Sequence, residues 1–210
     1  MMNIQLININ KKFSDKKILN NFNATFEPGM ITAVMGASGS GKTTLLNIIG
    51  LIEPFDAGSI MYGKCMIVKR SAIRNKLKFD ISFVFQNYGL LENESVFYNL
   101  SMSHRIKVLK KAKREKEIKS ALKLVNLSGF EDKEVYTLSG GEQQRVAIAK
   151  AMLKQARIIL ADEPTASIDE DNARLIMDLL RKMADVNKIV IVVTHSHEVA
   201  TYADKIIYLE

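Results

Sequence analysis

The stretch Gly36-Ala37-Ser38-Gly39-Ser40-Gly41-Lys42-Thr43-Thr44 decides the fold of this chain. It follows the apolar run 30–35 and precedes residues 45–49, which gives the order strand, glycine loop, helix that the phosphate-binding pattern GxxxxGK[ST] requires. Glycines let backbone N–H groups close around a polyphosphate, and the following helix presents its positive end. We therefore expect residues 36–44 to bind a nucleoside triphosphate, with Lys42 at its β- and γ-phosphates and Thr43 as a ligand of Mg²⁺.

The length and composition of the chain indicate one compact unit. Its 210 residues are 47% hydrophobic and 25% charged, which is ordinary for a globular protein. The net charge of +7 is compatible with an acidic partner such as nucleic acid, anionic lipid or a nucleotide, and does not choose among them. We interpret the basic residues of 107–119 as a solvated helix face, because no aromatic residues are interleaved with them, and we expect no nucleic-acid partner. The single cysteine, Cys65, excludes an internal disulfide and is expected to be buried or half-buried.

The sequence contains no candidate membrane segment. No stretch has 18 consecutive apolar residues, and residues 1–10 lack a basic region followed by an apolar one. We therefore expect neither a signal peptide nor an anchoring helix in this chain.

The apolar patterns predict an α/β fold with an inserted helical part. Strand patterns occur at 3–9, 18–26, 30–35, 59–62, 81–85, 157–161, 188–193 and 205–209. The first two suggest an antiparallel pair, and the runs 157–161 and 188–193 are typical of buried parallel strands. Residues 167–170 read as a capping box that opens an amphipathic helix ending near Met183. From Glu92 to about Gln155 the pattern is helical. We expect one domain, divided into 1–86 with 156–210 and a helical subdomain at 87–155.

Polar residues follow four of the predicted strands, where open α/β sheets bind their ligands. They are the phosphate loop, Gln86, the pair Asp162-Glu163, and His195. Asp162 is placed to hold Mg²⁺, and Glu163 to polarise or deprotonate an attacking water. Both acidic residues could instead cap the next helix. His195 could be an ordinary hydrogen-bonded histidine, but its place at a strand end favours a functional role.

A second glycine motif, residues 138–145 (LSGGEQQR), opens a helix before Asp162. Ser139 and Glu142 have the spacing of a capping box. Two adjacent glycines at a helix N-terminus also make a second anion site. One copy of the chain cannot obviously fold this site onto its own phosphate loop, whereas two copies facing each other could.

These motifs resemble those of the ATP-binding-cassette (ABC) ATPases over essentially the whole chain. The phosphate loop, the glutamine after a strand, LSGGEQQR, ILADEPT, SID and TH occur in the order of that family. FQNYGLLENESVFYNL and ILADEPTASID are similar to the macrolide-exporter and lipoprotein-release type. The resemblance implies a P-loop NTPase (RecA-like) core with an antiparallel β subdomain.

The resemblance also implies a role for each site residue. Two ATP molecules would lie at a head-to-tail homodimer interface, each between Lys42 of one copy and the glycine motif of the other. Phe13, where tyrosine is commoner, would stack on adenine. Gln86 would contact Mg²⁺ and the water, and His195 would hold the γ-phosphate. The remaining residues implied in nucleotide binding are Ser139, Gly140, Gly141, Gln143 and Asp169, the last of which would cross the interface.

The function implied is an ATPase subunit that powers transmembrane permease subunits from the inner face of the cell membrane, exporting peptides or hydrophobic compounds. Two alternatives remain open from sequence. One is an ATPase whose membrane partner moves no substrate but regulates cell-envelope enzymes. The other is a soluble nucleic-acid-associated ATPase, which the net charge of +7 suggests.

Overall fold

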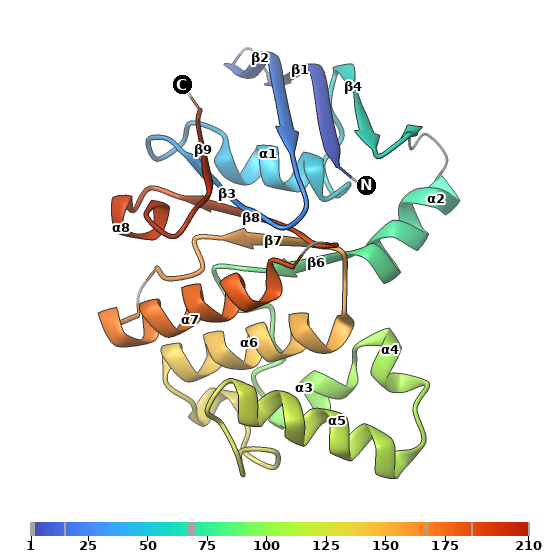
Figure 1. Ribbon diagram of the computed structural model, residues 1–210, viewed down its shortest axis with the longest axis vertical. Coiled ribbons are helices and arrows are strands. Elements are labelled where there is room, and N and C mark those ends of the chain that lie inside the picture. Colours follow the sequence, from blue (N-terminus) through green and yellow to red (C-terminus); the bar gives the residue numbers. More distant parts are fainter. Residues whose placement is uncertain (1–2, 15, 67–69, 167, 186, 210) are drawn as a thin grey trace.

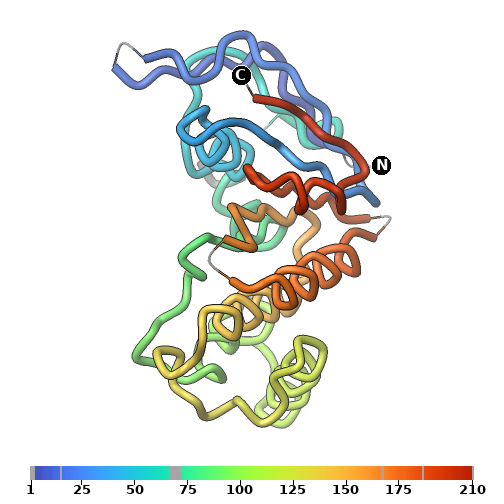
Figure 2. Tube along the Cα trace, turned by 90° about the vertical axis from the view of Figure 1, so that its left-hand side faces the viewer, coloured from blue at the N-terminus to red at the C-terminus, as the bar shows by residue number. Residues whose placement is uncertain are grey.

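The computed structural model describes residues 3–14, 16–66, 70–166, 168–185 and 187–209. Two sheets and a group of helices are stacked along the long axis of the molecule, with an antiparallel sheet at one end and the helices of residues 96–154 at the other (Figures 1 and 2). The parallel sheet lies between them. This arrangement gives the parallel sheet a covering layer on each face.

The antiparallel sheet has the strand order β2-β1-β4-β5. Its strands are β1 (Ile4–Phe13), β2 (Lys16–Phe26), β4 (Ala57–Tyr62) and β5 (Cys65–Met66). Strands β1 and β2 pair antiparallel with Ile4 opposite Phe26, which confirms the predicted pairing.

The parallel sheet has the order β6-β7-β8-β3-β9. Its strands are β3 (Ile31–Met35), β6 (Ile81–Val84), β7 (Ile158–Asp162), β8 (Ile189–Thr194) and β9 (Lys205–Tyr208). All residues of β3 and β8 are buried, as continuous apolar runs predict for strands covered on both faces. Because every pairing in this sheet is parallel, the carboxyl ends of the five strands share one edge.

The two faces of the parallel sheet bury separate cores. On one face, α1 (Lys42–Ile49) packs between the two sheets, with Leu45, Ile48 and Ile49 fully buried. On the other face lie α6 (Gly140–Lys154) and α7 (Glu170–Met183), side by side in Figure 1. The helices beyond α6 are α3 (Val96–Ser101), α4 (His104–Lys107), α5 (Lys111–Leu124) and the 3₁₀ turn η2 (Val135–Thr137).

The helices between residues 96 and 154 agree with the helical pattern predicted for residues 92–155. The expected boundaries at 86 and 155 fall in the connections after β6 and after α6, and the division of the chain there remains a prediction. The six lysines among residues 107–119 are exposed, as expected for a solvated face. None of the helices in the described ranges combines the length and apolar character needed to cross a bilayer.

Three features differ from the sequence prediction or add to it. Cys65 is exposed, because β5 is a two-residue edge strand, so the expected burial was wrong. Helix α7 begins at Glu170 with Asp169 as its N-cap, while Ser167 of the expected capping box lies outside the described residues. The structure also contains α2 (Arg70–Asn75), the π-helical turn η1 (Lys76–Asp80) and α8 (His197–Ala200), which the apolar pattern did not reveal.

Candidate nucleotide site

The phosphate loop joins β3 to α1 at the carboxyl edge of the parallel sheet. Gly41 is the N-cap of α1, and its φ of 97° lies in the left-handed region that glycine adopts without steric cost. A Cβ atom at position 41 would lie 2.3 Å from Cγ2 of Ile18 on β2. Backbone conformation and close packing therefore both require glycine at this point of the loop.

Lys42 is the first residue of α1 and folds back across the loop. Its Nζ donates hydrogen bonds to the carbonyl oxygens of Gly36, at 2.8 Å, and of Ala37, at 2.9 Å. Only 8% of the residue is exposed. The ammonium group is thus fixed beside the cleft described next, where it would meet phosphate oxygens.

A cleft of about 510 Å³ lies over the phosphate loop. It is lined by Ile18, Ser38, Gly39, Gly41, Lys42, Thr43, Thr44, Gln86, Glu163 and His195. The first N–H groups of α1 have no acceptor inside the helix, and the Ser40 hydroxyl is buried without a hydrogen-bond partner among the described residues. Unpaired donors beside a lysine fit a polyphosphate, so the residues present suit the triphosphate of ATP.

Thr43 lines the cleft and is hydrogen-bonded to Asp162, the last residue of β7, which lies just outside the cleft lining. The Thr43 hydroxyl donates to Oδ1 of Asp162 at 3.2 Å, so two residues that are 119 positions apart supply adjacent oxygen ligands. Burial raises the pKa of the Asp162 carboxyl, while the Thr43 hydrogen bond and the nearby Lys42 oppose that rise. A hydroxyl and a carboxylate next to phosphate oxygens form the kind of oxygen set that Mg²⁺ accepts. Gln86 lies after β6 and lines the same cleft.

Glu163 and His195 form one hydrogen-bonded group at the ends of β7 and β8. One carboxylate oxygen of Glu163 accepts from the backbone N–H of His195 at 3.1 Å and lies 2.8 Å from Nδ1 of the same residue. The other oxygen accepts from the Thr194 hydroxyl at 3.0 Å. The Glu163 side chain is 14% exposed and that of His195 is 69% exposed. The two residues are therefore positioned together, not independently.

The second glycine motif lies at the start of α6 and outside this cleft. Ser139 is the N-cap, and its side chain and that of Glu142 form the reciprocal bonds of a capping box, which confirms that prediction. The Gln143 amide donates to the carbonyl of Leu138 at 3.0 Å. Among the described residues, none of 139–143 lines the cleft. These residues, Gly140 and Gly141 included, are not brought to the phosphate loop of their own chain.

Phe13 and Asp169 also lie outside the cleft lining. Phe13, at the end of β1, is 48% exposed, and the ammonium of Lys11 lies 4.6 Å from the centre of its ring. Asp169 caps α7, where hydrogen bonds from Asn172 lower the pKa of its carboxyl. Both side chains are thus available at the surface near the ends of their elements. The stacking and interface roles expected of them remain predictions.

Two residues of the site were given no role in the sequence analysis. Ile18 lines the cleft from β2, and its contact with the glycine loop is a long-range one that strand periodicity cannot reveal. Thr194 is fully buried and holds both Glu163 and the backbone N–H of Ser196. Its place directly before His195, at the end of a buried strand, was the available signal.

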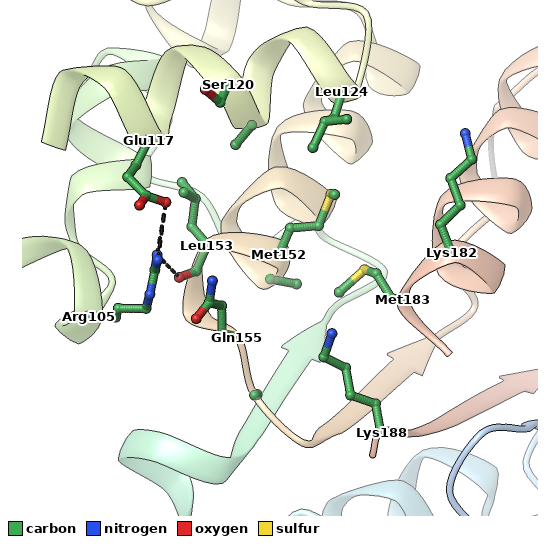
Figure 3. Close-up of a pocket in the computed structure, with 13 residues that line it drawn as sticks. Arg105, Glu117, Ser120, Leu124, Met152, Leu153, Gln155, Lys182, Met183 and Lys188 are labelled. Carbon is green, nitrogen blue, oxygen red and sulfur yellow. Dashed lines mark hydrogen bonds and ion pairs between the residues drawn. The ribbon is translucent and has the colours of Figure 1, made fainter. Parts of the chain in front are cut away.

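A second cavity, of about 270 Å³, lies among α5, α6 and α7 (Figure 3). Arg105 pairs with Glu117 at 3.1 Å on one side of it, and Lys188, which directly precedes β8, lies on another. Lys188 is paired with Asp185 at 2.8 Å. The cavity contains none of the expected site residues and lies toward the amino end of β8, so we place the nucleotide in the cleft over the phosphate loop.

Comparison with known proteins gives the family. The sequence profile of the ABC transporter family matches residues 19–166. A solved structure of the dimeric ATP-binding cassette MJ0796, in a post-hydrolysis state with ADP and Pi, superposes with a TM-score of 0.89 and 33% identity. That match covers 99% of this chain and 94% of the other.

Three curated relatives show how far the similarity extends. The lipoprotein-releasing system ATP-binding protein LolD 2 of Chlorobaculum tepidum is 34% identical, over 92% of this chain and 82% of the relative. The macrolide export protein MacB of Campylobacter jejuni is 34% identical over 99% of this chain and 33% of its own length. The spermidine/putrescine import protein PotA of Spiroplasma citri is 35% identical over 98% of this chain and 58% of its own. With its phosphate loop, its glycine motif and its fold, the chain belongs to the ABC transporter family as one of its ATP-binding cassettes.

Proposed function

We propose that this chain binds and hydrolyses ATP at the inner face of a cell membrane and thereby powers membrane transport subunits. One observation carries the proposal. The phosphate loop, the Thr43–Asp162 pair and the Glu163–His195 pair converge on one cleft at the carboxyl edge of the parallel sheet. Membership of the ABC transporter family supports the same conclusion.

Each of these groups has a task in transfer of the γ-phosphoryl group to water. Lys42 and the loop N–H groups hold the phosphates and neutralise their charge. The carboxylate of Glu163 keeps lone pairs beyond those used by Thr194 and His195, so it can accept a proton from the attacking water. His195, whose ring is largely exposed, would hold the γ-phosphate beside Glu163.

Thr43, Asp162 and Gln86 would hold Mg²⁺ in this cleft. When bound, the ion supplies positive charge at the β- and γ-phosphate oxygens. Burial raises the pKa of the Asp162 carboxyl, while the Thr43 hydrogen bond and the positive charge of Lys42 oppose that rise and favour the carboxylate that a Mg²⁺ ligand must be. The donor set, one hydroxyl and one carboxylate oxygen with an amide oxygen nearby, leaves the remaining positions to phosphate and water.

A second copy of the chain would complete the site. Because Ser139 and Gly141 stand outside their own cleft, their helix end can serve only a nucleotide held by another copy. The similar MJ0796 cassette is dimeric in a state with ADP and Pi, which supports a dimer of this chain. Asp169, exposed at the start of α7, would then lie at the interface.

The surface beside Gln86 is our proposed contact with the membrane subunits. It carries three exposed apolar side chains, those of Phe85 (38% exposed), Leu91 (46%) and Met102 (36%). A hollow of about 240 Å³ lies beneath Phe85 and Met102. A partner seated there would contact the segment that carries Gln86, a residue of the nucleotide cleft. Movement of that partner would in this way change the position of the Gln86 side chain in the nucleotide cleft.

The transported molecule is the finer part of the proposal. We propose export of peptides or hydrophobic compounds, which the similarity to the lipoprotein-release and macrolide-export proteins supports. The import function in the name of the PotA relative points the other way. Deleting the gene with its membrane partner should change peptide secretion or antimicrobial sensitivity. If neither changes for any peptide tested, the export assignment is wrong.

Phosphate release by the purified chain tests the proposed activity. With ATP and Mg²⁺ we expect steady hydrolysis that stops on chelation of Mg²⁺ and returns when the ion is restored. Lys42→Met should lower the rate by about 10²-fold or more, because charge on the transferring group loses its main partner. Lys182→Met makes the same chemical change at the cavity of Figure 3 and should hydrolyse like the parent. Absence of hydrolysis by the parent, or equal rates for both variants, would contradict the proposal.

A further inference from the structure

Asn172, in the first turn of α7, contacts two segments that the proposed dimer needs at its interface. Its backbone N–H and its side-chain Nδ2 donate to the two carboxylate oxygens of Asp169, at 2.9 and 2.6 Å. Its Oδ1 accepts a hydrogen bond from the guanidinium of Arg145, on the second turn of α6. One amide therefore links a cation on α6 to an anion at the start of α7.

The backbone of α6 approaches the same amide. A Cβ atom at Gly141 would lie 2.8 Å from Cγ of Asn172. Glycine at position 141 therefore allows the backbone of α6 to approach the Asn172 side chain of α7. Figure 1 shows α6 and α7 side by side with their N-terminal ends on the same side of the molecule. The end of α6 that carries the glycine motif is thus packed directly on the turn that carries Asp169.

The chemistry of this link requires an amide. Asparagine has one acceptor oxygen and two donor hydrogens, so it can accept from Arg145 and donate to Asp169 at the same time. Aspartate in its place would put two carboxylates in contact. Leucine would leave the guanidinium of Arg145 without its hydrogen-bond partner. Among the described residues Arg145 makes no other side-chain hydrogen bond, and its Nε atom is buried and unpaired.

We propose that Asn172 is a positioning residue that holds the glycine motif of α6 and the Asp169 turn in one fixed arrangement, so that both reach the nucleotide of a second copy together. The proposal rests on the dimer of the proposed function. Asn172 does not line the nucleotide cleft of its own chain. Its replacement should therefore leave ATP binding by the monomer unchanged and weaken the ATP-dependent dimer.

The test uses Asn172→Asp in the full chain, in a Glu163→Gln background that is expected to accumulate the ATP-bound dimer. We expect a fluorescent ATP analogue to bind the monomer as in the parent, while the dissociation constant of the ATP-bound dimer rises about tenfold or more. Asp178→Asn is the matched control, because it exchanges the same two groups on an exposed face of α7. The control should dimerise like the parent.

A second measurement distinguishes a role of Asn172 in the dimer from a role in the fold of the monomer alone. Amide hydrogen exchange of residues 139–143 in the monomer should become faster in Asn172→Leu, because leucine cannot accept the hydrogen bond from Arg145 and the link between α6 and α7 is lost. Unchanged exchange overturns the proposal, because Asn172 then holds nothing at the glycine motif. Faster exchange with an undiminished dimer also overturns it, since the link is then structural only.

A double-mutant cycle covers the case in which Asn172→Asp does not fold. Arg145→Met, Asn172→Leu and the double variant keep side-chain volume while removing the polar link. If the two residues act as one unit, the double variant should weaken the dimer no more than either single variant. Additive losses overturn the proposal. If the Glu163→Gln parent itself forms no dimer with ATP, the proposed dimer fails and the positioning role fails with it, a result distinct from failure of the Asn172 variants alone.

Discussion

Glu163 occupies a backbone conformation that residues with a side chain rarely adopt. Its φ is 44°, and its N–H donates to the carbonyl of Val193 at 2.9 Å. The left-handed turn directs the carboxylate to the end of β8, where Thr194 and His195 donate to it. Strain of this kind is often retained at functional sites because it aims a side chain. At this position it places a carboxylate within the nucleotide cleft.

Replacing Glu163 by glutamine should stop ATP turnover while leaving ATP bound. The amide oxygen can still accept from Thr194, so the fold and ATP binding should persist, but an amide cannot accept the proton of the attacking water. Turnover should fall about 10²- to 10³-fold, and ATP-bound dimers should accumulate in a sizing measurement. Glu170→Gln, on the exposed start of α7, is the control. A Glu163→Gln protein that hydrolyses ATP at the parental rate would refute the assignment of the base.

Lys11 shows what residue patterns could not predict. It lies on β1 with 6% of its surface exposed, paired with Glu53 at 2.5 Å and placed against the ring of Phe13. The apolar alternation of residues 3–9 ends before it, so the sequence indicated a shorter strand. The partner that permits its burial lies 42 positions away in the chain, and nothing local reveals such a pairing.

At the scale of elements, the strands were predictable where burial is continuous. Runs such as 157–161 and 188–193 gave β7 and β8 to within one residue, because a strand covered on both faces needs only apolar side chains. The π-helical turn at Lys76–Asp80 and the short α8 were missed, since four or five residues span too little of a helical period to show one. The start of α7 also differs from the prediction, because the expected capping box began at residue 167, whereas the N-cap of the helix is Asp169.

The Asp204 carboxylate links helix α7 to strand β3. Its carboxylate accepts from the guanidinium of Arg181 on α7 at 2.7 Å and from the N–H of Ile31, the first residue of β3, at 2.7 Å. These bonds, that with Arg181 foremost, lower the pKa of the carboxyl. Stabilisation by the carboxylate is therefore present above its ordinary pKa and is lost as the pH falls through the lowered value.

Asp204→Asn should reduce the free energy of unfolding at pH 7 by about 0.5–1 kcal/mol, a modest value because the pair is partly exposed and screened by solvent. The difference between parent and variant should begin to shrink as the pH falls below about 4, the ordinary aspartate pKa that applies to the unfolded chain, and should vanish as the pH falls through the lowered pKa of the folded Asp204 carboxyl. Urea unfolding at several pH values measures this. A difference that stays constant down to pH 2 would show that the charge of Asp204 contributes nothing.

At the scale of the whole molecule, the parallel sheet explains why the site could be anticipated. The phosphate loop, Asp162 and His195 are far apart in sequence, yet each follows a parallel strand, and parallel strands end at one edge. The direct bond between Glu163 and His195 could not be predicted, because it depends on the left-handed turn at Glu163. The position of the glycine motif outside the cleft agrees with a site that needs a second copy.

Mixing two inactive variants tests this shared site most directly. Lys42→Met disables the phosphate loop, and Ser139→Arg blocks the anion-binding end of α6. A mixed dimer would contain one site in which both parts are intact. Equal mixing should therefore restore roughly one quarter of the parental rate of ATP hydrolysis, because half of randomly formed dimers are mixed. A mixture whose rate merely equals the average of the two separate variants would contradict the account, since each site would then be completed within one chain.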